Sequence, residues 1–166
     1  EYSPANGWDE NKLKCFRRHV VALEKGALLF IYDEVEATEP VTWDYLLHTV
    51  TNPIEVEQAG SFLKVKATNS KGLSEAYLLS DSPLKYETTD QFFQPAVSWL
   101  RADAKGNMEK YENHWHFTAK TPKKISNKFV TIIDTRGKDA KAIELKLSAD
   151  NKSIVVGDWT LEYNLQ

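Results

Sequence analysis

The 166-residue chain has a single cysteine, Cys15, so an internal disulfide bond is impossible. On a strand, a lone cysteine is most simply a small buried hydrophobic residue, and a reactive thiol is the less common alternative. No stretch approaches the roughly 20 apolar residues of a membrane-spanning helix. The N-terminal residues lack the basic-then-apolar layout of a signal peptide. A fold that depends on internal disulfides or on a membrane-spanning helix within this sequence is therefore excluded.

Glycine is also scarce. The seven glycines are not clustered, so no glycine-rich loop of the phosphate-cradling kind is present. A Gly-x-Ser-x-Gly nucleophile elbow is absent as well. The net charge of -3, from 21 basic and 24 acidic residues, gives no electrostatic reason to expect nucleic acid or an anionic membrane as a partner. Small basic groups at residues 120–124 and 138–141 stand among turn-forming and acidic residues, which is typical of solvated loops.

Helical periodicity is nearly absent. The best candidate, residues 102–110, contains Gly106-Asn107 and makes a poor amphipathic face, so we predict a loop there. Residues 16–48 instead predict three consecutive strands of an antiparallel meander, separated at Lys25-Gly26 and at Glu39-Pro40. Further strands are expected at 53–57, 61–68, 73–79, 111–119, 128–135, 142–147, 153–156 and 159–163, and residues 91–100, interrupted by Pro95, predict an edge strand or an extended loop.

About ten to twelve short strands at regular spacing predict one all-β domain over residues 1–166, an antiparallel two-sheet β-sandwich. Because successive side chains on a strand point to opposite faces, every second residue should lie inside. The expected core residues are Trp43, Tyr45 and Leu47 on one strand, Trp115 and Phe117 on another, and Phe129, Thr131 and Ile133 on a third.

Two histidines are the candidate metal ligands. His114 and His116 are two residues apart, so a strand would place both on one face. Zinc needs a third and usually a fourth ligand, and Asp33 and His48 could serve only if the fold brings them near. The alternative interpretation is a polar outer face opposite buried aromatic residues, and a zinc site is the less common outcome.

Other polar residues predict structural roles. Asp33 and Glu34 are adjacent and should point to opposite strand faces, so they do not form a ready acid–base couple. We expect Asp33 to cap a turn or to pair with Arg17 or Arg18. His19 and His48 are expected to be hydrogen-bonded structural histidines.

The segment 90–101 is the candidate sugar contact. An indole such as Trp99 can stack on a pyranose ring, and the fork of Arg101 can hold a uronate or sulfate through two hydrogen bonds. Alternatively, Phe92, Phe93 and Trp99 cover the core beneath a long connection, which is the more common role of such side chains.

Several of these segments together carry a family resemblance. The motifs are an arginine-bearing strand, an apolar strand ending in Asp-Glu at residues 29–34, the strand 43–48 (Trp-Asp-Tyr-Leu-Leu-His), and the segments 113–117 and 129–133. This pattern resembles the later part of the β-sandwich domain of heparinase II/III-like polysaccharide lyases. The similarity covers roughly residues 12–135.

The resemblance implies a function for a larger parent protein. Family members cleave uronate-containing polysaccharides by β-elimination, which needs a base, an acid and a group that neutralises the uronate carboxylate. In the family, Tyr and His residues of an α/α-toroid domain do most of this work. A further His comes from the start of the sandwich, near a zinc site built from two His and an Asp. The toroid and the early sandwich segment have no counterpart here, so no catalytic or zinc-binding residue is transferred to this chain.

The resemblance therefore predicts the C-terminal sandwich module of a periplasmic or secreted lyase, preceded in the parent by the toroid. Its partner would be an acidic polysaccharide. We expect no catalytic residue and no cofactor in this chain, with zinc possible in the parent. Two alternatives from other classes remain: a stand-alone carbohydrate-binding or adhesion module, and a small metal-dependent enzyme that uses His114 and His116.

Overall fold

The computed structural model describes residues 12–49, 53–69, 72–91, 104–107 and 114–163. Apart from one short 3-10 turn, η2 (Glu24–Gly26), all regular structure in this part of the chain is β. The strands are β1 (Leu13–Leu23), β2 (Leu28–Val41), β3 (Asp44–Thr49), β4 (Glu55–Ala59), β5 (Phe62–Thr68), β6 (Leu73–Ser80), β7 (Lys85–Thr89), β8 (Trp115–Lys120), β9 (Lys124–Asp134), β10 (Leu145–Leu147), β11 (Ser153–Val156) and β12 (Trp159–Glu162).

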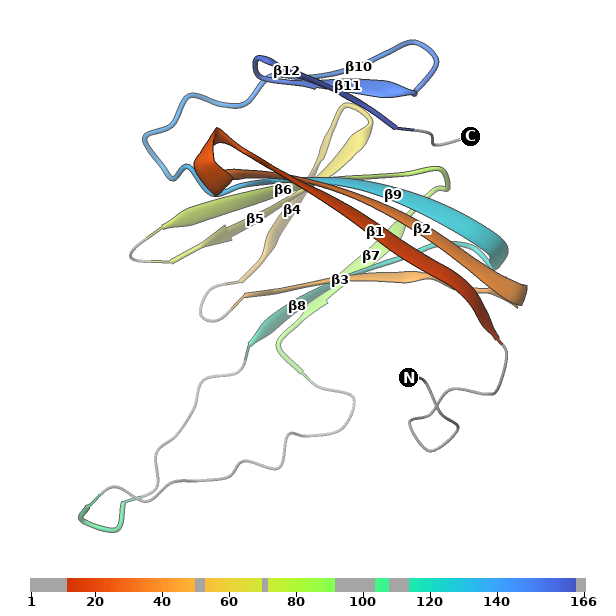
Figure 1. Ribbon diagram of the computed structural model, residues 1–166. Coiled ribbons are helices and arrows are strands. Elements are labelled where there is room, and N and C mark those ends of the chain that lie inside the picture. The colour runs from red at the N-terminus through yellow and green to blue at the C-terminus, as the bar shows by residue number, and fades with distance from the viewer. Residues whose placement is uncertain (1–11, 50–52, 70–71, 92–103, 108–113, 164–166) are drawn as a thin grey trace.

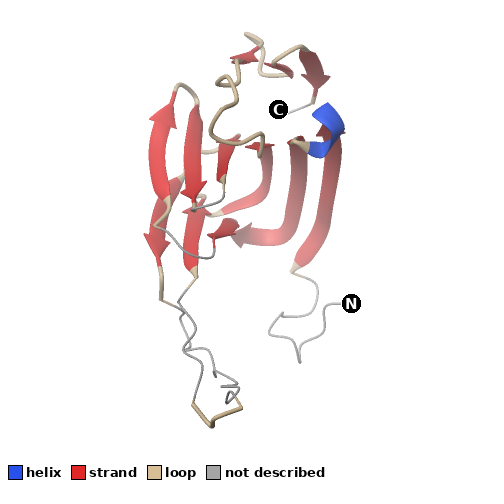
Figure 2. Ribbon diagram, turned by 90° about the vertical axis from the view of Figure 1, so that its left-hand side faces the viewer, coloured by secondary structure: helices blue, strands red, loops and turns tan. Residues whose placement is uncertain are grey.

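These strands form three antiparallel sheets. A six-stranded sheet has the order β1-β2-β9-β6-β5-β4, and two three-stranded sheets have the orders β3-β8-β7 and β10-β11-β12. The six-stranded sheet lies in the middle, with the other two on opposite faces (Figures 1 and 2). The predicted all-β, sandwich-like antiparallel fold is confirmed. The C-terminal strands add a third layer that the two-sheet prediction did not contain.

Two hydrophobic cores join the layers, and strand alternation explains both. From β2, Leu28, Phe30 and Tyr32 pack with Ile154 of β11 in the first core. Val35, on the opposite face of β2, belongs to the second core, which includes Phe117 of β8. A strand buried on both faces must be apolar at successive positions, as β2 and its neighbour β9 are.

The turn predicted at Lys25-Gly26 is confirmed as the connection between β1 and β2. Gly26 has φ +92°, a left-handed conformation that strains any residue with a Cβ. The predicted meander is wrong beyond this hairpin, because β3 pairs with β8 and not with β2. Glu39-Pro40 also does not end β2, which continues to Val41. The pairing of β2 with β9 is irregular between Glu36 and Val41, so the missing N–H of Pro40 costs no regular ladder bond there.

Other strand predictions differ in extent. The sequence did not predict β7, because its residues Lys-Tyr-Glu-Thr-Thr are mostly polar. The polar sequence suits its position, since β7 is an edge strand with three exposed residues. β9 begins at Lys124, before the expected start at residue 128, and β10 is limited to Leu145–Leu147. The expected segments at 91–100 and 102–110 lie largely outside the described residues.

The core prediction holds in part. Tyr45, Phe117, Phe129 and Thr131 are buried. Trp43, Leu47, Trp115 and Ile133 are partly buried and pack against the second core from its margin. Within the described residues, no helix is long and apolar enough to cross a membrane.

Candidate functional site

Strand pairing brings two of the four candidate metal ligands together. His48 of β3 lies opposite His116 of β8, with ring centroids 4.6 Å apart. His116 is buried, whereas His114 is exposed and precedes β8. Asp33 is held by Arg18 in the six-stranded sheet. Among the described residues, no group of three or more His, Cys, Asp or Glu side chains is placed to hold a metal ion.

The buried histidine predicts a pH effect on stability. Burial, followed by the imidazoles of His48 and His114, lowers the pKa of His116. The unfolded chain then binds this proton more tightly, so the free energy of unfolding should fall as pH drops from about 7 to about 5. His116→Gln should reduce this fall relative to wild type in urea titrations at both pH values. His19→Gln, which removes an exposed histidine from the other sheet, is the control, and equal pH dependence in all three proteins would contradict the prediction.

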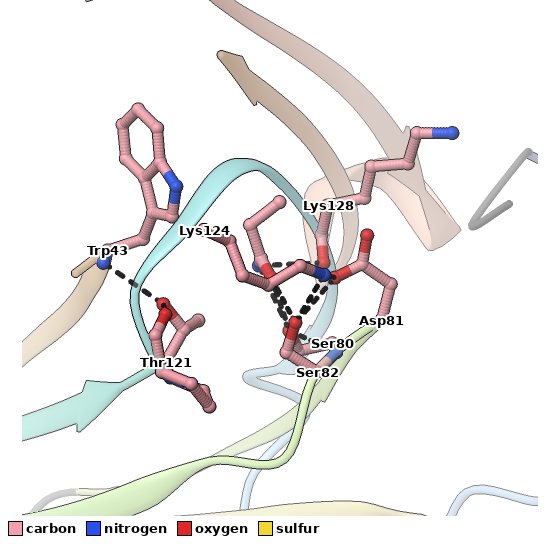
Figure 3. A network of polar contacts seen from close by, with 9 residues as sticks. Trp43, Ser80, Asp81, Ser82, Thr121, Lys124 and Lys128 are labelled. Carbon is pink, nitrogen blue, oxygen red and sulfur yellow. Dashed lines mark hydrogen bonds and ion pairs between the residues drawn. The ribbon is translucent and has the colours of Figure 1, made fainter. Parts of the chain in front are cut away.

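A polar network lies where β6 ends beside β9 (Figure 3). The hydroxyl of Ser82 donates to Oδ1 of Asn127 at 2.8 Å, and Asn127 is fully buried. Lys124 Nζ donates to Ser82 Oγ at 2.6 Å and to Asp81 Oδ1 at 3.0 Å. Asn127 Nδ2 also donates to Ser80 Oγ at 3.0 Å. These hydrogen bonds hold the bend at Asp81 and Ser82, directly after β6, against β9.

The Ser82–Lys124 contact has the residue types of a serine nucleophile with a lysine base, but its surroundings do not suit that chemistry. A lysine base must be neutral. Lys124 Nζ instead forms an ion pair with Asp81 at 3.0 Å, and Ser82 is buried. We therefore interpret the network as structural. The prediction that Lys124 belongs to a solvated loop is wrong, because this residue is half-buried in β9.

Residues 138–141 do lie in an exposed connection, as predicted. Lys138 and Lys141 line a small pocket of about 200 Å³ together with Lys64. Glu75 and Asp134 line the same pocket, so its positive charges are largely offset.

Arg18 and Asp33 form a bidentate ion pair across β1 and β2. The two residues are directly opposite in the strand register. Arg18 Nε and Nη2 donate to the two carboxylate oxygens of Asp33, each at 2.7 Å. The Asp33 side chain is 3% exposed and that of Arg18 is 45% exposed. Hydrogen bonding to Asp33 raises the pKa of Arg18. Of the alternatives expected for Asp33, pairing with Arg18 is confirmed.

This ion pair lines a groove between two sheet edges. β1 is the edge of the six-stranded sheet and β3 is the edge of the sheet that faces it. The space between these edges, here called the edge groove, has a volume of about 390 Å³. It is lined by Leu13, Phe16, Arg18, Asp33, Val35, Trp43, Asp44, Tyr45, Leu46 and Phe129.

The edge groove has a buried floor and an exposed rim. On the floor, the rings of Tyr45 and Phe129 lie 5.4 Å apart, and burial raises the pKa of Tyr45. On the rim, Phe16 is 53% exposed and Leu46 is 55% exposed, one on each edge strand. The guanidinium carbon of Arg18 lies 5.6 Å from the centroid of the Phe16 ring. An aromatic face beside fixed polar groups can bind a ligand with one apolar and one polar side.

Some residues of the edge groove carry sequence predictions, but for other roles. Asp33 and Arg18 were expected to pair, and Trp43, Tyr45 and Phe129 were expected in the core. The groove exists because β3 belongs to a different sheet from β1 and β2, so that β1 and β3 line it from two sheet edges. The candidates Trp99 and Arg101 lie outside the described residues. Cys15 is free and half-buried, not fully buried as expected.

No protein-family model matches the chain, and no curated protein matches it either. The class that the structure defines is an antiparallel β protein with an aromatic groove between two sheet edges.

Proposed function

We propose that this chain is the sandwich module of a heparinase II/III-like polysaccharide lyase, periplasmic or secreted. In this role it supports the catalytic domain of the parent and forms one wall of the glycan-binding cleft. The edge groove is the observation that carries the glycan-binding part of the proposal. It combines an exposed aromatic ring with a half-exposed arginine that a buried aspartate holds, and polar groups beside an aromatic face suit a sugar ring.

The environments of the polar clusters support a non-catalytic module. β-Elimination needs a base that can take a proton near neutral pH. Lys124 Nζ is paired with Asp81 at 3.0 Å, and Asp33 is paired with Arg18 at 2.7 Å. His116 is buried beside His48. Lys124 and Asp33 are each engaged by an opposite charge, and His116 lacks the exposure that a base acting on a polysaccharide needs.

Gel electrophoresis with and without embedded polysaccharide tests binding. Heparan sulfate, hyaluronan and alginate are the probes, and a glycan-contacting module should migrate more slowly in at least one of them. Unchanged migration in all three gels would contradict a role in the substrate cleft.

Catalysis is tested on the same three polysaccharides. We expect the isolated chain to form no unsaturated uronate. Ultraviolet absorbance measures this product. Sustained product formation that persists after treatment with a chelator would show that this chain carries the chemistry itself.

A stand-alone carbohydrate-binding module is the second candidate, because the edge groove supports it equally well. Coding sequence upstream of Glu1 separates the two. A helical catalytic domain there supports the lyase, and a signal peptide directly before Glu1 supports the stand-alone module.

A further inference from the structure

We propose that the edge groove binds one uncharged pyranose ring of a glycan, stacked on Phe16 and hydrogen-bonded by Arg18 and Asp44. This assignment rests on the proposed function, since it takes a glycan as the ligand. It goes further by naming the groove as the contact and an uncharged sugar unit as the part recognised.

The charges around the groove disfavour a uronate. Among the described residues that line it, Arg18 is the only cation, and the carboxylate of Asp33 already matches its charge at 2.7 Å. Asp44 adds a negative charge at the rim. Lys120, opposite Asp44 on β8, pairs with Glu87 at 2.9 Å, so it offsets Asp44 only in part. A uronate carboxylate would enter a site without a spare positive charge and would be repelled by Asp44.

The polar groups suit hydroxyls. A guanidinium has five N–H donors, and the side-on pair with Asp33 uses Nε and Nη2, which leaves Nη1 directed away from Asp33. The Asp44 carboxylate is an acceptor. A sugar hydroxyl can accept from Arg18, and another can donate to Asp44. Because the buried Asp33 fixes Arg18, less side-chain freedom is lost when a ligand binds.

The apolar groups and the size of the groove suit a sugar ring. The C–H face of a pyranose is apolar, and exposed Phe16 and Leu46 offer it apolar surface from both sheet edges. The volume of about 390 Å³ falls in the range of about 300–1,000 Å³ that is usual for small-ligand sites.

A hyaluronan oligosaccharide is the sharpest probe, because uronate and uncharged N-acetylhexosamine rings alternate along it. In saturation-transfer NMR on the whole chain, we expect the N-acetylhexosamine protons to receive the stronger signal. A cello-oligosaccharide, which is uncharged throughout, should bind and compete with it.

Variants locate the site. Phe16→Ala should weaken oligosaccharide binding at least about tenfold in titration calorimetry, because it removes the stacking surface. Phe16→Tyr should retain binding. Trp159→Ala, which removes a 47% exposed aromatic from β12, is the matched control and should bind like wild type. Thermal melting checks that each variant is folded.

The outcomes separate the two proposals. Wild-type binding that is unchanged in Phe16→Ala would overturn the groove assignment and leave the glycan-binding function standing. Stronger saturation of the uronate rings, with affinity that falls steeply as salt is added, would overturn the uncharged ring. Absence of binding to hyaluronan, heparan sulfate, alginate and the cello-oligosaccharide alike would overturn both proposals.

Discussion

Phe117→Ala is expected to lower the free energy of unfolding by about 3–5 kcal/mol, the usual cost of deleting a large buried aromatic side chain. Phe117 has no exposed surface and stands on β8, the central strand of its sheet. It belongs to the second core, where its removal would leave a cavity between β8 and the six-stranded sheet. Urea denaturation followed by tryptophan fluorescence measures the loss, with an unchanged m-value indicating the same unfolding reaction.

Tyr86→Ala is the matched control for this prediction. The Tyr86 ring lies 6.0 Å from that of Phe117, but Tyr86 is 49% exposed at the edge of the same sheet. Its removal should cost about 1 kcal/mol, the typical effect of a point mutation. Equal losses for the two variants would mean that β8 does not face a packed core.

Arg18→Gln is expected to cost about 2–3 kcal/mol, because it leaves the Asp33 carboxylate buried without its two charged hydrogen bonds. Arg17→Gln on the same strand is the control. Arg17 is 62% exposed, and its contact with Glu34 is 3.3 Å long, so its loss should cost less than about 1 kcal/mol. Both variants remove one positive charge, so a difference in stability between them does not come from net charge.

A double variant completes this comparison. Arg18→Gln combined with Asp33→Asn replaces the stranded carboxylate with a neutral amide that can bond to glutamine. We expect it to be more stable than Arg18→Gln alone, as coupling between direct partners requires. Additive losses in the double variant would show that the two side chains are not coupled in solution.

The sequence predicted the fold class because its strongest signal is local. The apolar residues of β2 and β9, the turn at Lys25-Gly26 and the scarcity of helical periodicity all indicate antiparallel strands. Strand partners depend on residues far apart in the sequence. The sequence therefore predicted that β3 pairs with β2, whereas it pairs with β8, some 70 residues away. Polar β7 carried too weak a pattern to be recognised.

The candidate site was predicted only in fragments. Pairing of Asp33 with Arg18 could be named because both charges lie on adjacent segments of one expected hairpin. The edge groove could not, because it requires β1 and β3 to be edges of different sheets. The contact between His48 and His116 likewise follows from a register that no local pattern specifies.

One titration can show whether the edge groove is the glycan-binding site. An isotopically labelled chain is titrated with the hyaluronan oligosaccharide while its backbone amide signals are followed by NMR. We expect the largest shifts in the part of β1 near Phe16 and at Asp44 at the start of β3. The signals of β10, β11 and β12 should not shift. Shifts confined to β10–β12, or no shifts at saturating oligosaccharide, would contradict this assignment.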